Sequence, residues 1–144
     1  CLLSRGLGDV YKRQLLLSPL SLVLGGCALL PAWHDPAQAW IDLAPGLQAV
    51  RVDERMLEDS RYFQVPPGRH ALQMRLRFEV APADTGSAQA LPRTCLLELD
   101  YAEFNAGQRY RLEAGHRGFR PWAQLRDAQD RPLARAREGR CGEV

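Results

Sequence analysis

Histidine is the first side chain to consider for catalysis or metal binding, and the chain contains three: His34, His70 and His116. A zinc site uses three or four ligands, typically with two of them close together in the sequence. No two of these histidines lie within thirty residues of each other. We therefore expect no metal site and no cofactor. An enzyme or metal carrier that depends on His70 or His116 is the least favoured alternative.

Nucleophilic catalysis has equally little support in the sequence. After position 27 the only serines are Ser60 and Ser87, and neither lies in the G-x-S-x-G pattern that presents a catalytic serine on a sharp turn. The adjacent carboxylates Glu58 and Asp59 are typical of a solvated surface loop. A glycine-rich phosphate-binding loop is also missing from the sequence. We therefore predict that the chain is not an enzyme.

The cysteine with the most informative surroundings is Cys27. It ends the segment Leu24-Gly25-Gly26-Cys27, which directly follows the apolar run of residues 15–24. A membrane-spanning helix needs about 20 apolar residues, whereas the apolar part of a signal peptide needs roughly 7–15. The segment resembles the lipobox of bacterial lipoprotein precursors. This resemblance implies that residues 15–26 are a lipoprotein signal peptide and that an acylated Cys27 begins the mature protein.

The segments on either side of this motif have separate interpretations. Residues 1–14 resemble a translated sequencing adapter, and are left out of the fold prediction; the alternative is a native basic region with Lys12 and Arg13. Residues 27–38 contain Pro31 and Pro36 without periodicity, which predicts a tether. The residues after Cys27 lack the aspartate of an inner-membrane retention signal. We therefore expect an outer-membrane lipid anchor and a domain that faces the periplasm.

Two further cysteines, Cys95 and Cys141, are predicted to form a disulfide. An exported protein commonly pairs its cysteines because the periplasm keeps them oxidised. The sequence has no CxxC motif and no histidine beside either cysteine. In the chain-entropy model, the bridge would stabilise the folded domain by about 4 kcal/mol.

The charge balance argues against one class of partner. The chain has 19 Lys and Arg against 17 Asp and Glu, but residues 1–26 hold three of the former and one of the latter. The remaining residues therefore carry no net charge. Nucleic-acid binding normally requires a basic surface, so we expect a membrane contact through the lipid anchor, an envelope protein or glycan as partner, and no nucleic acid.

Alternation of apolar and polar residues predicts an all-β domain over residues 39–144. The clearest strand covers residues 72–80, where Leu72, Met74, Leu76, Phe78 and Val80 alternate with polar residues such as Arg75 and Arg77. The predicted strands are 39–43, 47–53, 62–65, 72–80, 95–101, 109–114, 122–127 and 133–137, and the longest loops are 81–93 and 115–121. Seven or eight short strands favour a small antiparallel β-sandwich, with a small barrel as the alternative.

Two turn-and-strand segments are similar to those of known envelope proteins. They are Val65-Pro66-Pro67-Gly68-Arg69-His70 and Ala106-Gly107-Gln108-Arg109-Tyr110-Arg111-Leu112. Together they resemble small proteobacterial lipoproteins of unassigned function and, more loosely, the β-sandwich modules called PEGA domains. The resemblance covers residues 62–127. It implies an Ig-like or prealbumin-like sandwich at the cell envelope, and it brings no catalytic residue.

The segment that best fits contact with a partner is the predicted loop 115–121 with the following residue. Its candidate contact residues are Arg117, Phe119, Arg120 and Trp122. Arginine and aromatic side chains are enriched at binding hot spots. The competing interpretation is a bulged hairpin whose Phe119 and Trp122 pack into the edge of the core. We therefore predict a non-enzymatic binding or structural module, with contact to polysaccharide or peptidoglycan as an alternative role.

Overall fold

The computed structural model describes residues 34–58 and 62–142 of the chain. The adapter-like segment, the predicted signal peptide and Cys27 lie outside these residues. The described part is all-β: it contains ten strands and one helical turn, α1 (Pro82–Thr85). Within it, no helix is long and apolar enough to span a bilayer.

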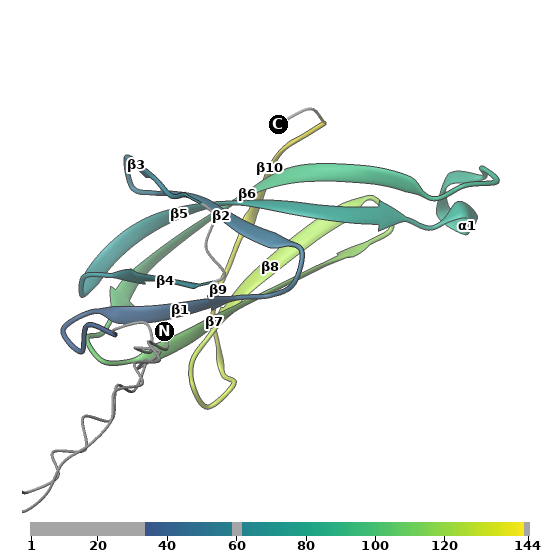
Figure 1. The fold of residues 1–144 in the computed structure, drawn as a ribbon. Coiled ribbons are helices and arrows are strands. Elements are labelled where there is room, and N and C mark those ends of the chain that lie inside the picture. The colour runs from purple at the N-terminus through teal and green to yellow at the C-terminus, as the bar shows by residue number, and fades with distance from the viewer. Residues whose placement is uncertain (1–33, 59–61, 143–144) are drawn as a thin grey trace, which may run out of the picture. The chain divides into compact units, whose positions relative to one another are not determined.

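The strands form two five-stranded sheets (Figure 1). Sheet A has the order β4 (Tyr62–Val65), β1 (Ala39–Leu43), β7 (Arg109–Arg117), β8 (Arg120–Arg126) and β9 (Pro132–Arg135). Sheet B has the order β10 (Arg137–Cys141), β6 (Leu91–Phe104), β5 (Gly68–Val80), β2 (Leu47–Val52) and β3 (Arg55–Met56).

The inner faces of the two sheets share one apolar core. On β5 the predicted alternation is confirmed, because Leu72, Met74, Leu76 and Val80 are buried while Arg77 is exposed. Phe78, also predicted to point inward, is half-buried. Sheet A contributes buried residues of the same cluster, including Ile41, Val65, Leu112 and Leu125. Burying each large side chain contributes about 1.5–3 kcal/mol, so this core is what holds the sandwich together.

The strand count is ten in the described residues, not seven or eight. Two features account for the difference. The predicted strand 133–137 divides into β9 and β10, because the chain leaves sheet A near Ala136 and joins sheet B. The polar segment 53–60 contains the two-residue strand β3, which pairs with β2. Neither feature has an apolar alternation long enough to be recognised in the sequence.

The sheets are antiparallel with one exception, the pair of β1 and β7, which is parallel. The predicted antiparallel all-β class is confirmed, and β1–β7 is the one parallel pair among the described strands. β1 runs antiparallel to β4 on its other side, with Ile41 opposite Phe63. Alternation reports which side chains are buried but carries no information on strand direction, so the sequence did not reveal this pairing.

The predicted loop 81–93 is shorter in the structure than in the sequence interpretation. It contains α1, and β6 begins at Leu91. The segment is rich in Ala, Pro, Gly and Ser, a composition that favours a loop, and Pro92 lacks the N–H donor of a sheet residue. It is tolerated here because β10 extends along β6 only as far as Cys95, which leaves one side of β6 open beside Pro92.

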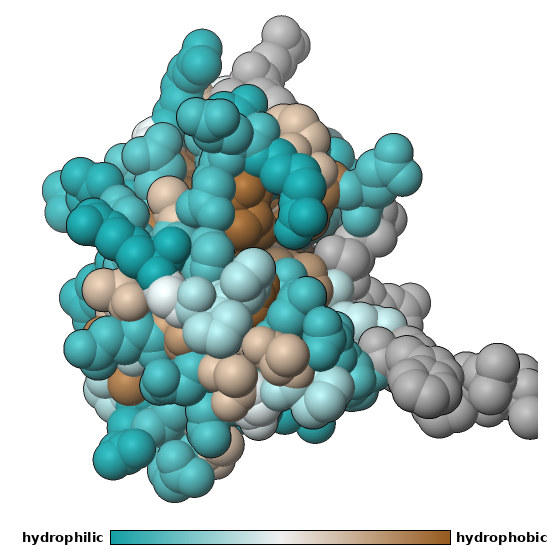
Figure 2. All heavy atoms as spheres, turned by 90° about the vertical axis from the view of Figure 1, so that its left-hand side faces the viewer, coloured by the Kyte–Doolittle hydropathy of each residue, from teal (hydrophilic) through white to brown (hydrophobic). Residues whose placement is uncertain are grey.

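The sandwich has two distinct ends along the strands of sheet A. The chain enters at β1, where Trp40 lies opposite Arg109, the first residue of β7. The β7–β8 turn lies at the other end of β7, a strand of nine residues that spans roughly 30 Å. In Figure 1 this turn and the β5–β6 connection are on the right, and the entry end is on the left. Figure 2 shows that the entry end is covered mainly by hydrophilic residues, with apolar ones scattered between them.

Candidate functional site

The predicted contact segment 115–121 is a tight hairpin and not a loop. β7 continues to Arg117 and β8 starts at Arg120, directly opposite. The two residues between them are Gly118 and Phe119, of which only Gly118 has a positive φ (57°). A two-residue turn with glycine first is the pattern of a type II′ turn, whose twist matches that of the strands. The segment is therefore held rigidly by sheet A.

The outer face of β8 presents every second residue of that strand. Arg120 and Trp122 are exposed and Gln124 is half-buried, whereas Pro121, Ala123 and Leu125 between them are buried. On the neighbouring strand β9, Arg135 lies opposite Gln124. The strict alternation of a strand thus places cationic and aromatic side chains side by side on one surface.

These side chains line a groove of about 350 Å³ on the outer face of sheet A. Its lining consists of Arg117, Arg120, Pro121, Trp122, Gln124, Arg126 and Arg135. We call this feature the arginine groove. Four of its seven lining residues are arginines and none is acidic, so its electrostatic potential favours an anion.

Trp122 lies over a glycine of the neighbouring strand. It is directly opposite Gly115 on β7. A Cβ atom at Gly115 would lie only 2.8 Å from Cζ2 of the indole, with Cε2 and Nε1 at 3.0 and 3.1 Å. Only glycine leaves this space, and a tryptophan that covers a cross-strand glycine is a known way to protect a sheet. The indole is therefore seated on the sheet while 36% of the residue remains exposed.

Arg126 is the one arginine of the groove whose charge is compensated. Its Nε lies 2.7 Å from Oε2 of Glu113, and its Nη1 lies 3.7 Å from Oδ2 of Asp130. Arg111 pairs with the same two carboxylates. These ion pairs hold Arg126 at the end of the groove farther from the β7–β8 turn, which we call its inner end.

The other three arginines of the groove have no such partner. None of the ion pairs formed within residues 34–58 and 62–142 includes Arg117, Arg120 or Arg135. Exposed like charges repel one another, and clefts lined by one sign of charge concentrate ligands of the opposite sign. The arrangement can therefore bind an anionic group through bidentate hydrogen bonds from guanidinium.

Phe119 belongs to the turn but not to the lining of the groove. It is 40% exposed, and the guanidinium carbon of Arg93, on β6, lies 5.3 Å from its ring centroid. The interpretation that Phe119 and Trp122 are core residues is not supported, since both are exposed. The sequence analysis grouped Phe119 with Arg117, Arg120 and Trp122. In the structure these three residues line the groove and Phe119 does not.

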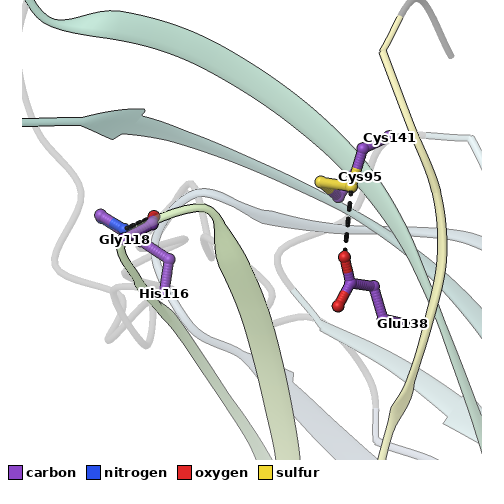
Figure 3. Close-up of a disulfide and its surroundings, with 5 residues drawn as sticks. All are labelled: Cys95, His116, Gly118, Glu138 and Cys141. Carbon is purple, nitrogen blue, oxygen red and sulfur yellow. Dashed lines mark hydrogen bonds between the residues drawn. A yellow bond between two sulfur atoms is a disulfide. The ribbon is translucent and has the colours of Figure 1, made fainter. Parts of the chain in front are cut away.

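His116 has a packing role next to this turn. Its ring stacks on Phe78 of β5, with centroids 4.5 Å apart, and its Nδ1 lies 3.0 Å from the carbonyl oxygen of Gly118 (Figure 3). These contacts join the distal ends of the two sheets. They explain why Phe78 is only half-buried: it covers the end of the core instead of its centre.

His70 is engaged at both ring nitrogens. Nδ1 lies 2.7 Å from Oδ2 of Asp53, and Nε2 lies 2.7 Å from the carbonyl oxygen of Pro66. Both partners are acceptor oxygens, one of a carboxylate and one of a backbone carbonyl. In this arrangement His70 has no free nitrogen for a metal or a substrate proton.

Asp53 and Asp42 are two carboxyl groups whose pKa is lowered in the folded protein, as is that of Asp127. The backbone N–H of Ala71 and the ring of His70 lower the pKa of Asp53. At Asp42 burial raises the pKa, but hydrogen bonds from Arg109 and Trp40 outweigh this effect and lower the pKa. Both carboxylates therefore stay ionised and paired at neutral pH.

The predicted disulfide joins Cys95 on β6 to Cys141 on β10 (Figure 3). The two residues are opposite each other in sheet B. The bridge fixes the last strand to the sheet. The carboxylate of Glu138 lies 3.8 Å from Cys141 Sγ, but a bridged sulfur has no proton to donate, so this is a contact without a hydrogen bond.

Metal binding finds no support in the part of the chain that the structure describes, which contains no cluster of three or more His, Cys, Asp or Glu suited to an ion. Comparison of the chain with protein-family models, curated proteins and solved structures gives no match. The resemblance to small lipoproteins and PEGA domains therefore stays a prediction, and the groove is interpreted from its own chemistry.

Sequence reasoning found part of the groove and missed the rest. It singled out Arg117, Arg120 and Trp122, which the structure brings together. It missed Gln124 and Arg126, although alternation along residues 120–126 places both on the same face as Trp122. Arg135 comes from the next strand, and its position depends on a strand register that the sequence does not contain.

Proposed function

We propose that the protein is a lipid-anchored, non-enzymatic binding module of the bacterial cell envelope, and that the arginine groove is its binding face. The observation that carries the proposal is the gathering of Arg117, Arg120 and Arg135 around a half-exposed Trp122 without a described carboxylate partner. Residues selected for stability alone would pair or disperse these charges. Function commonly retains groups that stability does not favour.

The composition of the groove also fits binding better than solubility. Arginine and tryptophan are the side chains most enriched among binding hot spots, since each offers a large contact area and directed hydrogen bonds. Seating the indole on Gly115 fixes it before a ligand arrives. A preorganised site loses less conformational entropy on binding.

The anchor is proposed from the sequence alone. The apolar run of residues 15–24 followed by Leu24-Gly25-Gly26-Cys27 supports acylation at Cys27 and export to the outer membrane. Two or more acyl chains suffice for stable membrane attachment. The chain enters the sandwich at the end opposite the β7–β8 turn, so the point of attachment and the arginines of the turn lie at different ends of sheet A.

A charge reversal tests the binding face. The full chain, expressed behind an added start methionine and purified in detergent, is incubated with solubilised envelope fractions, and the amount of bound envelope material is measured. Arg117→Glu with Arg120→Glu should reduce binding at least tenfold. Arg77→Glu is the matched control, because Arg77 is an exposed arginine of sheet B that lies outside the groove. Equal losses in both variants, or none in either, would contradict the proposal.

The anchor has its own test. Cells expressing the full chain are labelled with a palmitate analogue, and the envelope is fractionated. Wild-type protein should incorporate the label and sediment with the outer membrane, whereas Cys27→Ser should do neither. Label incorporation that does not depend on Cys27 would exclude acylation at this position.

A further inference from the structure

We propose that the arginine groove binds an acidic sugar unit of a glycan. The sugar ring packs on Trp122, and its carboxylate or phosphate lies among Arg117, Arg120 and Arg135. This inference rests on the proposed function and names the ligand of the same site. It is built from the shape of the groove, the kind of side chains in it and its position in the fold.

The first step is the pairing of an aromatic surface with cations. An indole presents a large apolar surface, and the C–H groups on one face of a pyranose ring are apolar as well, so the two pack together in water. A site for a bare anion needs no such surface. In the groove the half-exposed indole of Trp122 is flanked by Arg120 on its own strand and by Arg117 across the turn.

The second step is the sign and the arrangement of charge. Arg126, at the inner end, is already held by Glu113 and Asp130, so it leaves the binding of an anion to the other three arginines. Guanidinium matches the geometry of carboxylate and phosphate through two parallel hydrogen bonds. Gln124 adds an uncharged amide, which can both donate to and accept from a sugar hydroxyl.

The third step is size. The groove of about 350 Å³ is at the lower end of the range for small-molecule sites, roughly 300–1,000 Å³. It therefore suits one or two sugar units and not a folded protein surface, which requires about 800 Å² from each partner. It lies on the outer face of a sheet, where the rest of a polymer can continue beyond the site.

The fourth step is position, which favours a glycan over the headgroups of the anchoring membrane. The groove begins at the β7–β8 turn, roughly 30 Å along β7 from the strand where the chain enters the sandwich. The proposed anchor at Cys27 precedes the strand at which the chain enters the sandwich, so Arg117 and Arg120 lie at the end of β7 away from that entry point. This separation favours a polymer of the periplasm over the headgroups of the anchoring leaflet as the ligand.

The experiment is a titration of the detergent-purified full chain with four probes: a carboxylated oligogalacturonate, its neutral methyl ester, a phosphorylated oligomannose and inorganic polyphosphate. Binding is measured by calorimetry at low and at moderate salt. We expect at least one acidic oligosaccharide to bind, and the neutral ester and polyphosphate to bind at least tenfold more weakly. The carboxylated and phosphorylated probes identify which anion the arginines select.

Two substitutions separate sugar packing from charge. Trp122→Ala should weaken binding of the acidic oligosaccharide at least tenfold, and Trp122→Phe should retain most of it, since a smaller ring still offers an apolar face. Arg77→Ala should have no effect. A melting curve for each variant verifies that it is folded. If polyphosphate binds as tightly as the sugars and Trp122→Ala changes nothing, the groove is a general anion site and the inference is overturned.

The outcomes also distinguish this inference from the function beneath it. If no acidic oligosaccharide binds but Arg117→Glu with Arg120→Glu still abolishes binding of envelope material, the glycan is the wrong ligand and the binding module stands. If the charge reversal has no effect on binding to envelope fractions, the proposed function fails and the glycan inference fails with it.

Discussion

Both ends of the outer face of sheet A carry arginine beside tryptophan, yet the two ends treat these side chains differently. At the entry end, Asp42 accepts hydrogen bonds from Trp40 Nε1 (2.7 Å) and Arg109 Nε (2.6 Å). Trp40 is 8% exposed there and stacks on Tyr62 with ring centroids 4.2 Å apart. At the distal end, Trp122 is 36% exposed, and its neighbours Arg117 and Arg120 have no described acidic partner.

The comparison shows that residue type alone does not assign a role. Arginine and tryptophan form a closed cluster where a carboxylate accepts their hydrogen bonds, as Asp42 does. They line an open groove where no such carboxylate is described. The closed cluster satisfies its own hydrogen bonds, so its contribution is structural. The open groove leaves its donors to solvent, which is the condition for a ligand to compete for them.

The largest expected effect is a loss of stability that leaves binding by the arginine groove unchanged. Replacing Cys95 and Cys141 by alanine should lower the free energy of unfolding by about 2–5 kcal/mol, because the bridge no longer restricts the unfolded chain. Neither cysteine lines the groove, so the folded fraction should still bind envelope material. Chemical denaturation and the binding assay measure the two quantities. A folded fraction that no longer binds would mean that the groove depends on the bridge.

A smaller loss of stability is expected when a side chain is added at Gly115, beneath the indole of Trp122. Gly115→Ala would place a Cβ 2.8 Å from Cζ2 of the indole. The ring lies at the surface and can swing away, so the cost should be about 1 kcal/mol, the lower end of the range for overpacking. The displaced indole should show red-shifted fluorescence, and binding should weaken. An unchanged spectrum would show that the indole does not rest on Gly115.

Acid should weaken the closed sites and leave the open groove unchanged. The pKa values of Asp42 and Asp53 are lowered in the folded protein. Their stabilising contribution is therefore complete above the pKa of an unfolded aspartate, about 3.9, and is lost as the pH falls through the lower folded value. Melting temperatures measured from pH 7 to pH 3 should fall below about pH 4. Asp42→Asn should flatten this fall, whereas Asp84→Asn, on α1, should not.

The smallest effect on stability is expected at Phe119. The residue is 40% exposed and its ring is covered on one side by Arg93. Phe119→Ala should therefore cost about 1 kcal/mol or less, the value of an exposed cation–π contact, in contrast to about 3–5 kcal/mol for a core phenylalanine. Thermal unfolding distinguishes these values. A collapse of the melting temperature would restore the interpretation of Phe119 as a core residue.

The parts of the molecule that could be predicted from the sequence are those that depend on local pattern. The alternation at Leu72, Met74 and Leu76 determines which face of β5 is buried, and the all-β class follows from several such segments. The bridge from Cys95 to Cys141 could be predicted because only two cysteines follow Cys27 in the sequence. In each case a single segment or a simple count held the information.

The parts that could not be predicted depend on which strands become neighbours. The parallel pair of β1 and β7 and the crossing near Ala136 from one sheet to the other arise from packing of the whole domain. The same holds for the groove. Arg120 and Trp122 share a strand, but whether Arg126 is neutralised by Glu113 and Arg135 joins the cluster is decided by strand register.

The most direct test of the central claim compares the two ends by charge removal at low ionic strength. Melting temperatures are measured for Arg109→Gln and for the double variant Arg117→Gln with Arg120→Gln. Arg109→Gln breaks the ion pair with Asp42 and should lower the melting temperature, by a loss of up to about 1 kcal/mol. The double variant removes mutual repulsion and should leave the melting temperature unchanged or raise it, while binding to envelope material is lost. A double variant that melts lower than Arg109→Gln would show that the groove arginines are structural, and would contradict the account.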